Sequence, residues 1–347
     1  MESVEVDGSY GEGGGQILRT AAAFAVALQK PIRVTNIRAG REVPGLRQQH
    51  VSALEILAAV SRGRLEGCRV GSQEITFFPG KGGGGSLFFD LKTAASITLV
   101  LQAVVPAVSL SRGALSLELV GGTDVPWSPT FDYFANVVRH AFSSVGVVFH
   151  AEAVSRGYYP KGGGRAKVSI EGCDSPKSLV MVGPPRSVGA SVVSRCASLP
   201  DHVARRQMVS AVDTLKSKGI PVAQATSVRE QSISPGSSVL VWDVATDIAV
   251  GADSIGARGK SAESVGAEAG ERFASTIASG ACIDSNLADM LAPVLSMAQD
   301  ESQIRIQGST EHLETNLYVA RLFTSSTYSI EKKETSSVLR ITPASHG

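Results

Sequence analysis

The sequence is poor in cysteine and carries almost no excess of either charge. Its 347 residues include four cysteines, and none of them forms a Cys-x-x-Cys pair. This scatter argues against a zinc site and a disulfide framework and favours reduced, buried thiols. Lys and Arg number 33 against 32 Asp and Glu, a formal net charge of +1. Global charge therefore attracts no nucleic acid, and a polyanionic partner must be held by a local patch.

Long hydrophobic runs are also missing. The most apolar stretch, residues 93–110, is interrupted by Thr98, Gln102 and Pro106 and barely reaches the length of a membrane span. We therefore expect a buried helix there. The first five residues lack the basic and apolar regions of a signal peptide. A soluble, cytoplasmic protein without a membrane partner is expected.

Glycine, by contrast, is abundant, with 36 residues, about a tenth of the chain against a typical share of about 7%. Three clusters stand out, at residues 11–15, 80–85 and 160–164. Their uninterrupted runs begin at residues 13, 82 and 162, which gives spacings of 69 and 80 residues. These spacings are long for a solenoid repeat. They predict repeated α+β modules in one compact domain, with the clusters at equivalent turns.

Apolar periodicity predicts helices and strands in a similar order after the first two clusters. The expected helices cover residues 17–28, 46–61, 93–105 and 130–145. The expected strands cover residues 32–37, 115–120 and 166–170. Helix pairs packed on small sheets are therefore expected.

From about residue 184 the order changes. Helix 202–218, strand 238–244 and helix 261–279 are typical of a small α/β insert. Helices 287–297 and 313–323 and strands 303–306 and 337–341 follow. We predict an α/β protein whose large domain, residues 1–183 and 279–347, is interrupted by an inserted domain at residues 184–278.

The glycine clusters do not match the common nucleotide-binding loops. Gln16 stands where GxGxxG needs its last glycine, and neither Gly80-Lys81 nor Gly259-Lys260-Ser261 has the upstream glycine of a P-loop. Structural turns are the simpler explanation of the clusters. Glu12 and Arg19 could still supply a carboxylate for Mg²⁺ and a guanidinium for phosphate.

Basic residues gather between Lys30 and Arg47, where Glu42 is the only acid. This patch suits either a solvated surface strip or an anion site, since arginines such as Arg38 and Arg41 bind phosphate in bidentate fashion. None of the six histidines has a metal-binding spacing. His312 is the best candidate for a nucleophile, because it lies at the start of a predicted helix, after Gly308-Ser309, where backbone N–H groups can bind phosphate.

Several strings, taken in order, resemble RNA 3′-terminal phosphate cyclases. They are Gly11-Glu12-Gly13-Gly14-Gly15-Gln16-Ile17-Leu18-Arg19, Ile37-Arg38-Ala39-Gly40-Arg41, Pro44-Gly45-Leu46 with Gln49-His50, Thr98-Leu99-Val100-Leu101-Gln102, Gly121-Gly122-Thr123-Asp124, Gly157-Tyr158-Tyr159-Pro160-Lys161-Gly162-Gly163-Gly164 and His312-Leu313-Glu314-Thr315-Asn316. Each string is weak alone, but in this order they cover nearly the whole chain.

The resemblance implies a large domain of three repeated modules, each like the C-terminal domain of translation initiation factor three, with a small α/β domain inserted into the third. It also implies a reaction with ATP and Mg²⁺ or Mn²⁺ on an RNA that ends in a 3′-phosphate. A histidine takes AMP, the AMP passes to the RNA phosphate, and the neighbouring 2′-hydroxyl closes a 2′,3′-cyclic phosphate and expels AMP.

The resemblance also assigns site residues. It puts the nucleophile on His312 and the metal-binding carboxylate on Glu12. Nucleotide and phosphate contacts fall on Arg19, Arg38, Arg41, Gln49, Gln102, Asn286, Leu287, Ala288, Asp289 and Met290. Bacterial members read Tyr-Leu-Ala-Asp-Gln in the last segment. Asn286 cannot stack on adenine as tyrosine does, and Met290 cannot hydrogen-bond as glutamine does. This departure concerns base selectivity rather than the histidine chemistry.

Two other functions stay open. A cyclase-like factor in ribosomal RNA processing would act without adenylylation, and members of that branch lack the histidine, so His312 argues against it. A transferase of the enolpyruvyl type uses a related module and would act on phosphoenolpyruvate without a nucleotide. The strings around His312 and Arg38 argue against that function.

Overall fold

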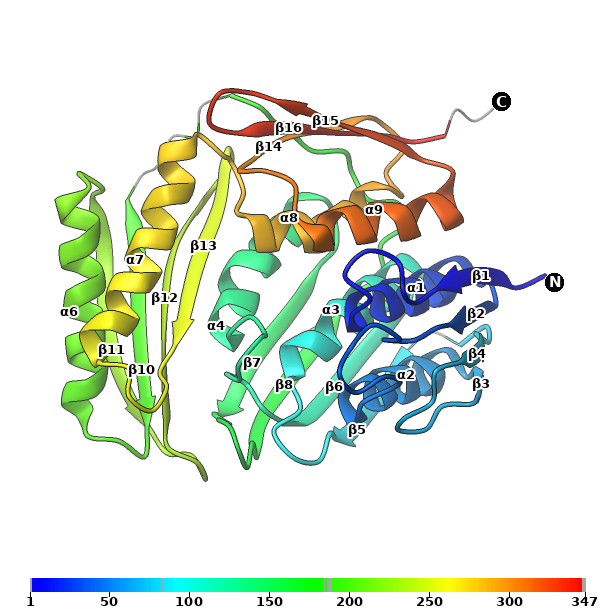
Figure 1. The fold of residues 1–347 in the computed structure, drawn as a ribbon, viewed down its shortest axis with the longest axis horizontal. Coiled ribbons are helices and arrows are strands. Elements are labelled where there is room, and N and C mark those ends of the chain that lie inside the picture. The colour runs from blue at the N-terminus through cyan, green and yellow to red at the C-terminus, as the bar shows by residue number, and fades with distance from the viewer. Residues whose placement is uncertain (1, 83, 184, 186–188, 345–347) are drawn as a thin grey trace.

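The computed structural model describes residues 2–82, 84–183, 185 and 189–344. Gly83 of the second glycine cluster, residue 184 at the predicted start of the inserted domain, and the predicted domain ends at residues 1 and 347 lie outside the described residues. Within them, the chain forms four small mixed sheets with helices packed against them (Figure 1). The predicted mixed α/β class is confirmed.

The first sheet is built from the N-terminal residues. Its strands, in spatial order, are β1 (Val4–Asp7), β2 (Ile32–Thr35), β4 (Ile75–Phe78) and β3 (Arg64–Glu66). β1 and β2 are parallel, and the other neighbours are antiparallel. A parallel pair needs a crossover connection, which α1 (Gly15–Leu28) provides, and α2 (Gln48–Ser61) connects β2 to β3.

Two further sheets repeat this order and these directions. The second contains β5 (Gly84–Asp90), β6 (Ala114–Gly121), β8 (Gly164–Ile170) and β7 (Phe149–Ser155). The third contains β9 (Val180–Met181), β14 (Ser302–Ile306), β16 (Ser337–Thr342) and β15 (Thr327–Lys332). The connectivity strand, helix, strand, helix, strand, strand therefore occurs three times among the described residues.

The helices of these two sheets agree with the predicted ones to within a few residues. They are α3 (Ile97–Leu110), a helical segment made of α4 (Phe131–Tyr133), a π-helical turn (Phe134–Val138) and α5 (Arg139–Ser144), then α8 (Ser285–Leu295) and α9 (Glu311–Thr324). α3 begins four residues later than predicted. Lys92 and Thr93 have positive φ angles, which a helix does not allow, and the Ser96 hydroxyl caps the helix by accepting from Leu99 N (3.2 Å).

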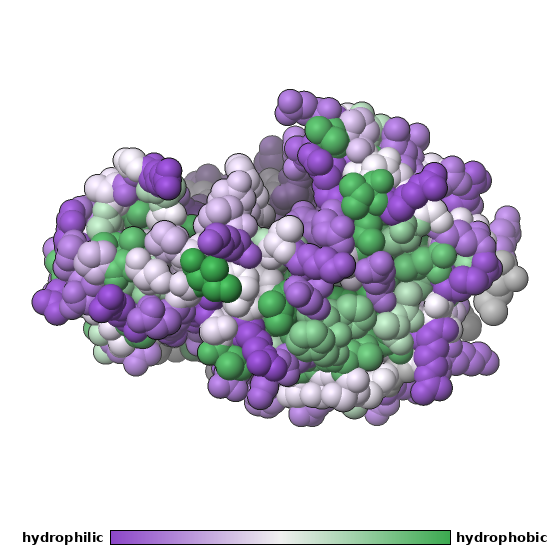
Figure 2. Space-filling model, turned by 90° about the horizontal axis from the view of Figure 1, so that it is seen from below, coloured by the Kyte–Doolittle hydropathy of each residue, from purple (hydrophilic) through white to green (hydrophobic). Residues whose placement is uncertain are grey.

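The fourth sheet is formed by the chain between β9 and α8. Its strands, in spatial order, are β11 (Val222–Glu230), β10 (Ala190–Ala197), β12 (Gly236–Ala245) and β13 (Ile248–Ile255). α6 (Asp201–Ser217) and α7 (Ala262–Ser279) pack against it around a second hydrophobic core. This unit lies at the left of Figure 1, and Figure 2 shows it from below beside the larger part of the molecule.

Buried ion pairs join the fourth sheet to the rest of the protein. Arg156, 5% exposed, pairs with Asp124 (3.2 Å), Asp132 (2.6 Å) and Glu230 of β11 (3.5 Å). Arg195 of β10 also pairs with Asp132 (2.6 Å). Because buried charges are stable only when they are paired, this network fixes how the fourth sheet sits beside α4 and β7.

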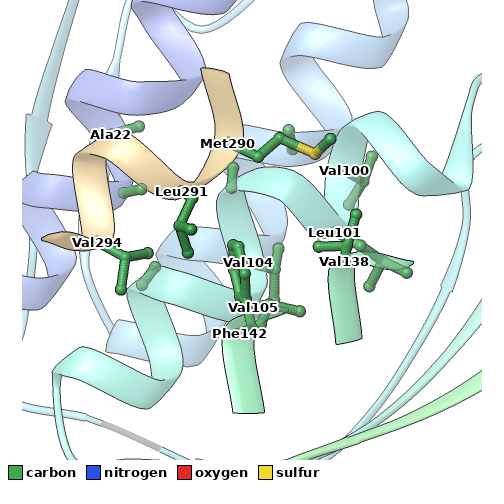
Figure 3. Close-up of a cluster of buried hydrophobic side chains, with 14 of the residues drawn as sticks. Ala22, Val100, Leu101, Val104, Val105, Val138, Phe142, Met290, Leu291 and Val294 are labelled. Atoms are coloured by element: carbon green, nitrogen blue, oxygen red, sulfur yellow. The ribbon is translucent and has the colours of Figure 1, made fainter. Parts of the chain in front are cut away.

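The long helices lie in the middle of the larger part, with the three related sheets around them (Figure 1). α3 packs against both α1 and α2. It is therefore buried on nearly every side, which explains its apolar sequence. Figure 3 shows the contact of α8 with this core, where Leu291 and Val294 lie beside Ala22 and Val104.

The three glycine clusters do not occupy equivalent turns, so that prediction was wrong. The first lies between β1 and α1, the second leads from β4 into β5, and the third lies between β7 and β8. Local backbone crowding explains the last two. A Cβ on Gly84 would lie 2.3 Å from the carbonyl oxygen of Ala114, and one on Gly162 would lie 2.5 Å from that of Thr93.

Two properties predicted from composition can be compared directly with the fold. Among the described residues, we find no helix with the length and apolarity that a membrane crossing requires. The four cysteines are free; Cys173, Cys196 and Cys282 are buried and Cys68 is half-buried.

Candidate active site

A cleft of about 800 Å³ lies between the larger part of the protein and the fourth sheet. One side, here called the arginine wall, consists of Glu12, Arg19, Arg38, Arg41, Arg47, Gln49 and His50. The opposite side, the inserted wall, consists of Asp253, Ser254, Lys260, Glu268 and Arg272. The floor between them includes Gln102, Asn286, Asp289, Met290 and His312. Ten of the twelve predicted site residues therefore line one cleft.

The first glycine cluster allows the arginine wall to pack closely. A Cβ on Gly15 would lie only 2.2 Å from Nε2 of His50, and one on Gly14 would lie 3.2 Å from a guanidinium nitrogen of Arg41. Gly11 and Gly13 have φ angles of 62° and 59°, which glycine adopts without strain. The cluster is thus a tight loop that brings Glu12 to the cleft.

His312 lies in the first turn of α9, directly beside Glu12. Its Nδ1 is 2.8 Å from Oε2 of Glu12, while Oε1 of Glu12 pairs with Arg41. A carboxylate only accepts hydrogen bonds, so in the neutral ring the proton is on Nδ1 and the lone pair of Nε2 is free. The side chain of His312 is 49% exposed, which leaves the ring accessible from the cleft.

Arg19 and Arg38 carry positive charge without a carboxylate partner at ion-pair distance among the described residues. Arg19 donates to Oε1 of Gln16 (2.7 Å), and its buried Nε has no partner there. Burial lowers the pKa of Arg19 to about 10, so it stays protonated at neutral pH. Arg38 donates to the carbonyl oxygens of Val43 (2.8 Å) and Gly45 (3.0 Å). Such uncompensated guanidinium groups suit a bound phosphate.

His50 is buried behind these arginines. Burial, together with the charges of Arg19, Arg38 and Arg47, lowers the pKa of His50 to about 3, so the ring is neutral. Its Nδ1 accepts from the backbone N–H of Arg47 (3.0 Å), which puts the proton on Nε2. Nε2–H is therefore a hydrogen-bond donor on the side of the glycine loop.

The inserted wall has balanced charge. Lys260 pairs with Glu268 and donates to Oγ of Ser254 (3.0 Å), and Arg272 donates to the carbonyl oxygen of Asp253 (2.7 Å). The carboxylate of Asp253 accepts from the backbone N–H of Thr130 (2.6 Å). These contacts hold β13 and α7 against the loop that precedes α4.

The predicted contact segment on α8 faces the cleft with only three of its five side chains. Asn286, Asp289 and Met290 line the cleft, whereas Leu287 and Ala288 are buried in the helical core, at 0% and 2% exposure. Because neighbouring residues on a helix point about 100° apart, one face cannot present all five. The side chains of Leu287 and Ala288 therefore do not reach a ligand in the cleft.

Met290 and Asp289 are constrained by their surroundings. Met290 is 8% exposed, and Figure 3 shows it reaching over α3 toward Val100. Asp289 accepts from the hydroxyl of Thr310 (2.6 Å), the residue that caps α9 just before His312. Burial raises the pKa of Asp289 to about 7. The floor thus joins α8 to the first turn of the helix that carries His312.

Several residues that line the cleft are not predicted from the sequence. His50 belongs to the string Gln49-His50 and Arg47 ends the basic patch, but neither was assigned a role in the site. Lys260 was weighed only in a P-loop match that failed, and Trp127 and Arg272 have no signal in the linear sequence, because folding alone brings them to the cleft. Only the tertiary structure reveals that Trp127 and the residues of the inserted wall lie at the cleft.

Glu12 was predicted to bind a metal ion. Within residues 2–82, 84–183, 185 and 189–344, no three His, Cys, Asp or Glu side chains are grouped so as to hold one. Glu12 is thus a single carboxylate, and its two oxygens contact Arg41 and His312. This arrangement does not suit a resident metal with an all-protein coordination shell.

An accessible imidazole, oriented by a carboxylate and near two arginines without a carboxylate partner, is chemically suited to nucleophilic attack on phosphate. Residues 10–330 match the RNA 3′-terminal phosphate cyclase family, and the chain belongs to that family. It is 42% identical over 332 residues to the RNA 3′-terminal phosphate cyclase of Thermococcus gammatolerans, with 95% of each chain covered. The cyclase of Pyrococcus furiosus is 40% identical over 318 residues, 92% of each chain. That of Methanopyrus kandleri is 39% identical over 342 residues, 96% of this chain and 97% of the relative.

Proposed function

We propose that this protein uses ATP to convert an RNA 3′-phosphate end into a 2′,3′-cyclic phosphate through a covalent AMP adduct of His312. The observation that carries the proposal is the pair formed by His312 and Glu12 (2.8 Å) in the same cleft as Arg19 and Arg38. Family membership supports the overall reaction, and this geometry supports the choice of nucleophile.

In the first step, Nε2 of His312 attacks the α-phosphorus of ATP. A P–N bond forms, the bond from that phosphorus to the bridging oxygen breaks, and pyrophosphate leaves. The ring becomes positively charged as the bond forms, and the carboxylate of Glu12 stabilises that charge through Nδ1–H. The N-terminus of α9 adds a favourable dipole for the phosphate oxygens.

In the second step, an oxygen of the RNA 3′-phosphate attacks the same phosphorus, the P–N bond breaks, and His312 is regenerated. The 2′-hydroxyl then attacks the RNA phosphorus, AMP leaves, and the hydroxyl proton is lost to solvent. This closure is intramolecular, so it has a small entropic cost. The need for a neighbouring hydroxyl selects RNA ends over DNA ends.

The arginine wall holds the phosphates in this proposal. Two polyanionic substrates repel each other, and Arg19, Arg38 and Arg41 compensate their charge. Gln49 and Gln102 offer polar contacts, and Asn286, Asp289 and Met290 border the nucleotide from the floor. The guanidinium group suits this task because it stays charged and binds phosphate through two N–H groups at once.

A divalent ion fits the site only as a partner of the nucleotide. Mg²⁺ commonly uses one or two carboxylates and completes its shell with substrate phosphates and water. Glu12 would be that carboxylate for Mg²⁺ or Mn²⁺. Such an ion would screen the phosphate charge.

We also propose that the three related sheets with their helices are three repeated modules, like the C-terminal domain of translation initiation factor three. Residues 184–278 would form a domain inserted into the third module, with residues 1–183 and 279–347 as the large domain. The shared strand order of three sheets and the separate hydrophobic core of the fourth support this division.

The proposed function is tested by incubating the protein with α-labelled ATP and Mg²⁺. The wild type should acquire an acid-labile label, and His312→Ala should acquire none. His202→Ala is the matched control, because His202 is exposed on α6 and does not line the cleft. An RNA 3′-phosphate should then become resistant to phosphatase.

Two results would contradict the proposal: no label on the wild type, or undiminished label on His312→Ala. Tight RNA binding without any label would instead favour the cyclase-like processing factor.

A further inference from the structure

Trp127 is the most exposed large hydrophobic side chain among the described residues, and it lines the proposed active-site cleft. Its relative exposure is 97%, whereas the other described tryptophan, Trp242, is partly buried in β12. An indole ring left in water forfeits a large gain from burial. A ligand contact at the edge of the cleft would recover that gain.

The loop that carries Trp127 is anchored on both sides. Ser128 donates through its hydroxyl to the carbonyl oxygen of Val125 (2.9 Å), and Thr98 of α3 donates in the same way to that of Pro129 (2.8 Å). The backbone N–H of Thr130 donates to Asp253 of the inserted wall (2.6 Å). The ring is therefore presented by a fixed backbone rather than by a free loop.

The backbone at Trp127 is also strained. Its φ angle is 60°, in the left-handed region that bulky residues rarely adopt. Pro126 and Pro129 flank it and limit the conformations open to the loop. A strained residue held by anchored neighbours is typical of a ligand contact, because the surrounding structure must maintain it.

We propose that Trp127 is a stacking platform for a base near the 3′ end of the RNA substrate. Aromatic side chains next to positively charged grooves bind single-stranded nucleic acid by stacking on bases, with little sequence preference. The adjoining arginine wall supplies the charge. This inference rests on the proposed function, since it assumes that RNA is the substrate.

The nearly complete exposure of the ring indicates RNA rather than ATP. A mononucleotide can be enclosed by a cleft of about 800 Å³. The RNA, in contrast, must extend out of the cleft behind its terminal phosphate, and its bases pass the rim. Because the ring of Trp127 faces solvent in the free protein, it can contact the part of the RNA that extends out of the cleft.

The first test measures direct binding of a 5′-labelled, 3′-phosphorylated RNA oligonucleotide without ATP. Trp127→Ala should weaken binding by about 5- to 100-fold, the loss expected for one base–aromatic stack, and Trp127→Phe should keep most of the affinity. Phe88→Ala is the matched control, because Phe88 is 60% exposed on β5 and does not line the cleft. Its RNA affinity should equal that of the wild type.

The second test measures how the ATP concentration affects labelling of the protein in the absence of RNA. The ATP concentration that gives half-maximal labelling should differ by less than twofold between Trp127→Ala and the wild type. A large rise in the ATP requirement, with RNA affinity unchanged, would overturn the inference and place adenine on the ring. RNA affinity of Trp127→Ala equal to that of Phe88→Ala would also overturn it.

A third test identifies the base and does not depend on catalysis. In a Trp242→Phe background, Trp127 is the only tryptophan, and RNA should quench its fluorescence. RNAs with an abasic site at one of the last three positions should bind the wild type less tightly. At the position whose base stacks on Trp127, the loss of affinity from the abasic site and the loss from Trp127→Ala should not be additive. Quenching with failed labelling of the wild type would refute the proposed function and keep the stacking contact. Additive losses at every position would refute the contact itself.

Discussion

The two walls of the cleft have a similar number of charged side chains, but one wall is net positive and the other is balanced. The arginine wall holds Arg19, Arg38, Arg41 and Arg47 against the single acid Glu12. The inserted wall holds Lys260 and Arg272 against Asp253 and Glu268. Its cations are therefore matched in number by acids, whereas most of the cations on the arginine wall are not. The uncompensated positive charge of the cleft therefore lies on one side.

The difference has a physical cause. A half-buried guanidinium without a counter-ion loses hydration and gains no compensating pair, which destabilises the free protein. Burial lowers the pKa of both Arg19 and Arg38, which is the signature of that penalty. A bound phosphate removes it. On the inserted wall, Lys260 and Glu268 already compensate each other, so that wall serves mainly to shape the cleft.

The largest effect is expected from Glu12→Gln. The amide keeps the shape but loses the charge that stabilises the ring of His312 during attack, so the rate of protein labelling by ATP should fall by about 10²- to 10³-fold. Glu268→Gln, the matched change on the inserted wall, should lower the rate by less than about threefold, since it acts at a distance. The measurement is single-turnover labelling at saturating ATP. Equal losses in the two variants would show that the walls do not differ.

A smaller effect is expected from Arg19→Met. Methionine keeps the apolar stem but removes the charge, and one charged hydrogen bond to phosphate is worth about 1.5 to 3 kcal/mol, or about 10- to 100-fold in ATP affinity. Lys260→Met is the control on the inserted wall and should change the affinity by less than about threefold. Equilibrium binding of a non-hydrolysable ATP analogue reports both values. If Lys260→Met proves as harmful as Arg19→Met, the phosphates span both walls.

The contrast between the walls also shows what the sequence can reveal. Arg19, Arg38 and Arg41 lie in short strings within the first 41 residues, and a string is recognisable because loop geometry fixes its spacing. Lys260 lies in the loop before α7 and its partner Glu268 lies on α7. Nothing in the sequence indicates that this ion pair faces a cleft. That position depends on how Arg156 and Asp132 hold the fourth sheet through their ion pairs with Glu230 and Arg195.

The fold could be predicted in part for a similar reason. The helices were recognised because the period of their apolar residues reports a buried face. Strands were recognised less completely. Short ones such as β3 and β9, of three and two residues, carry no such period, and longer ones such as β11 and β13 were missed as well. The spacings of the glycine clusters, 69 and 80 residues, do not report equivalent turns, because each cluster meets a different local need. Leu287 and Ala288 were assigned to the site as parts of a string, although a helix turns them into the core.

The smallest effect concerns the floor between the walls, where Asp289→Asn should change the pH dependence of stability. Burial raises the pKa of Asp289 to about 7 from the 3.8 of an exposed carboxyl. Between about pH 4 and pH 7 the folded protein therefore keeps a proton on Asp289 that the unfolded chain has lost, so the contribution of Asp289 to stability falls as pH rises through this range and levels off above it. Asparagine does not titrate, and its side-chain oxygen can still accept from Thr310. From pH 5 to pH 8, Asp289→Asn should thus gain about 2 to 3 kcal/mol relative to the wild type in urea unfolding. A difference that stays constant over this range would mean that Asp289 is already ionised at pH 5. The floor would then carry a negative charge beside Glu12, and the arginine wall would have to compensate it before it could hold phosphate.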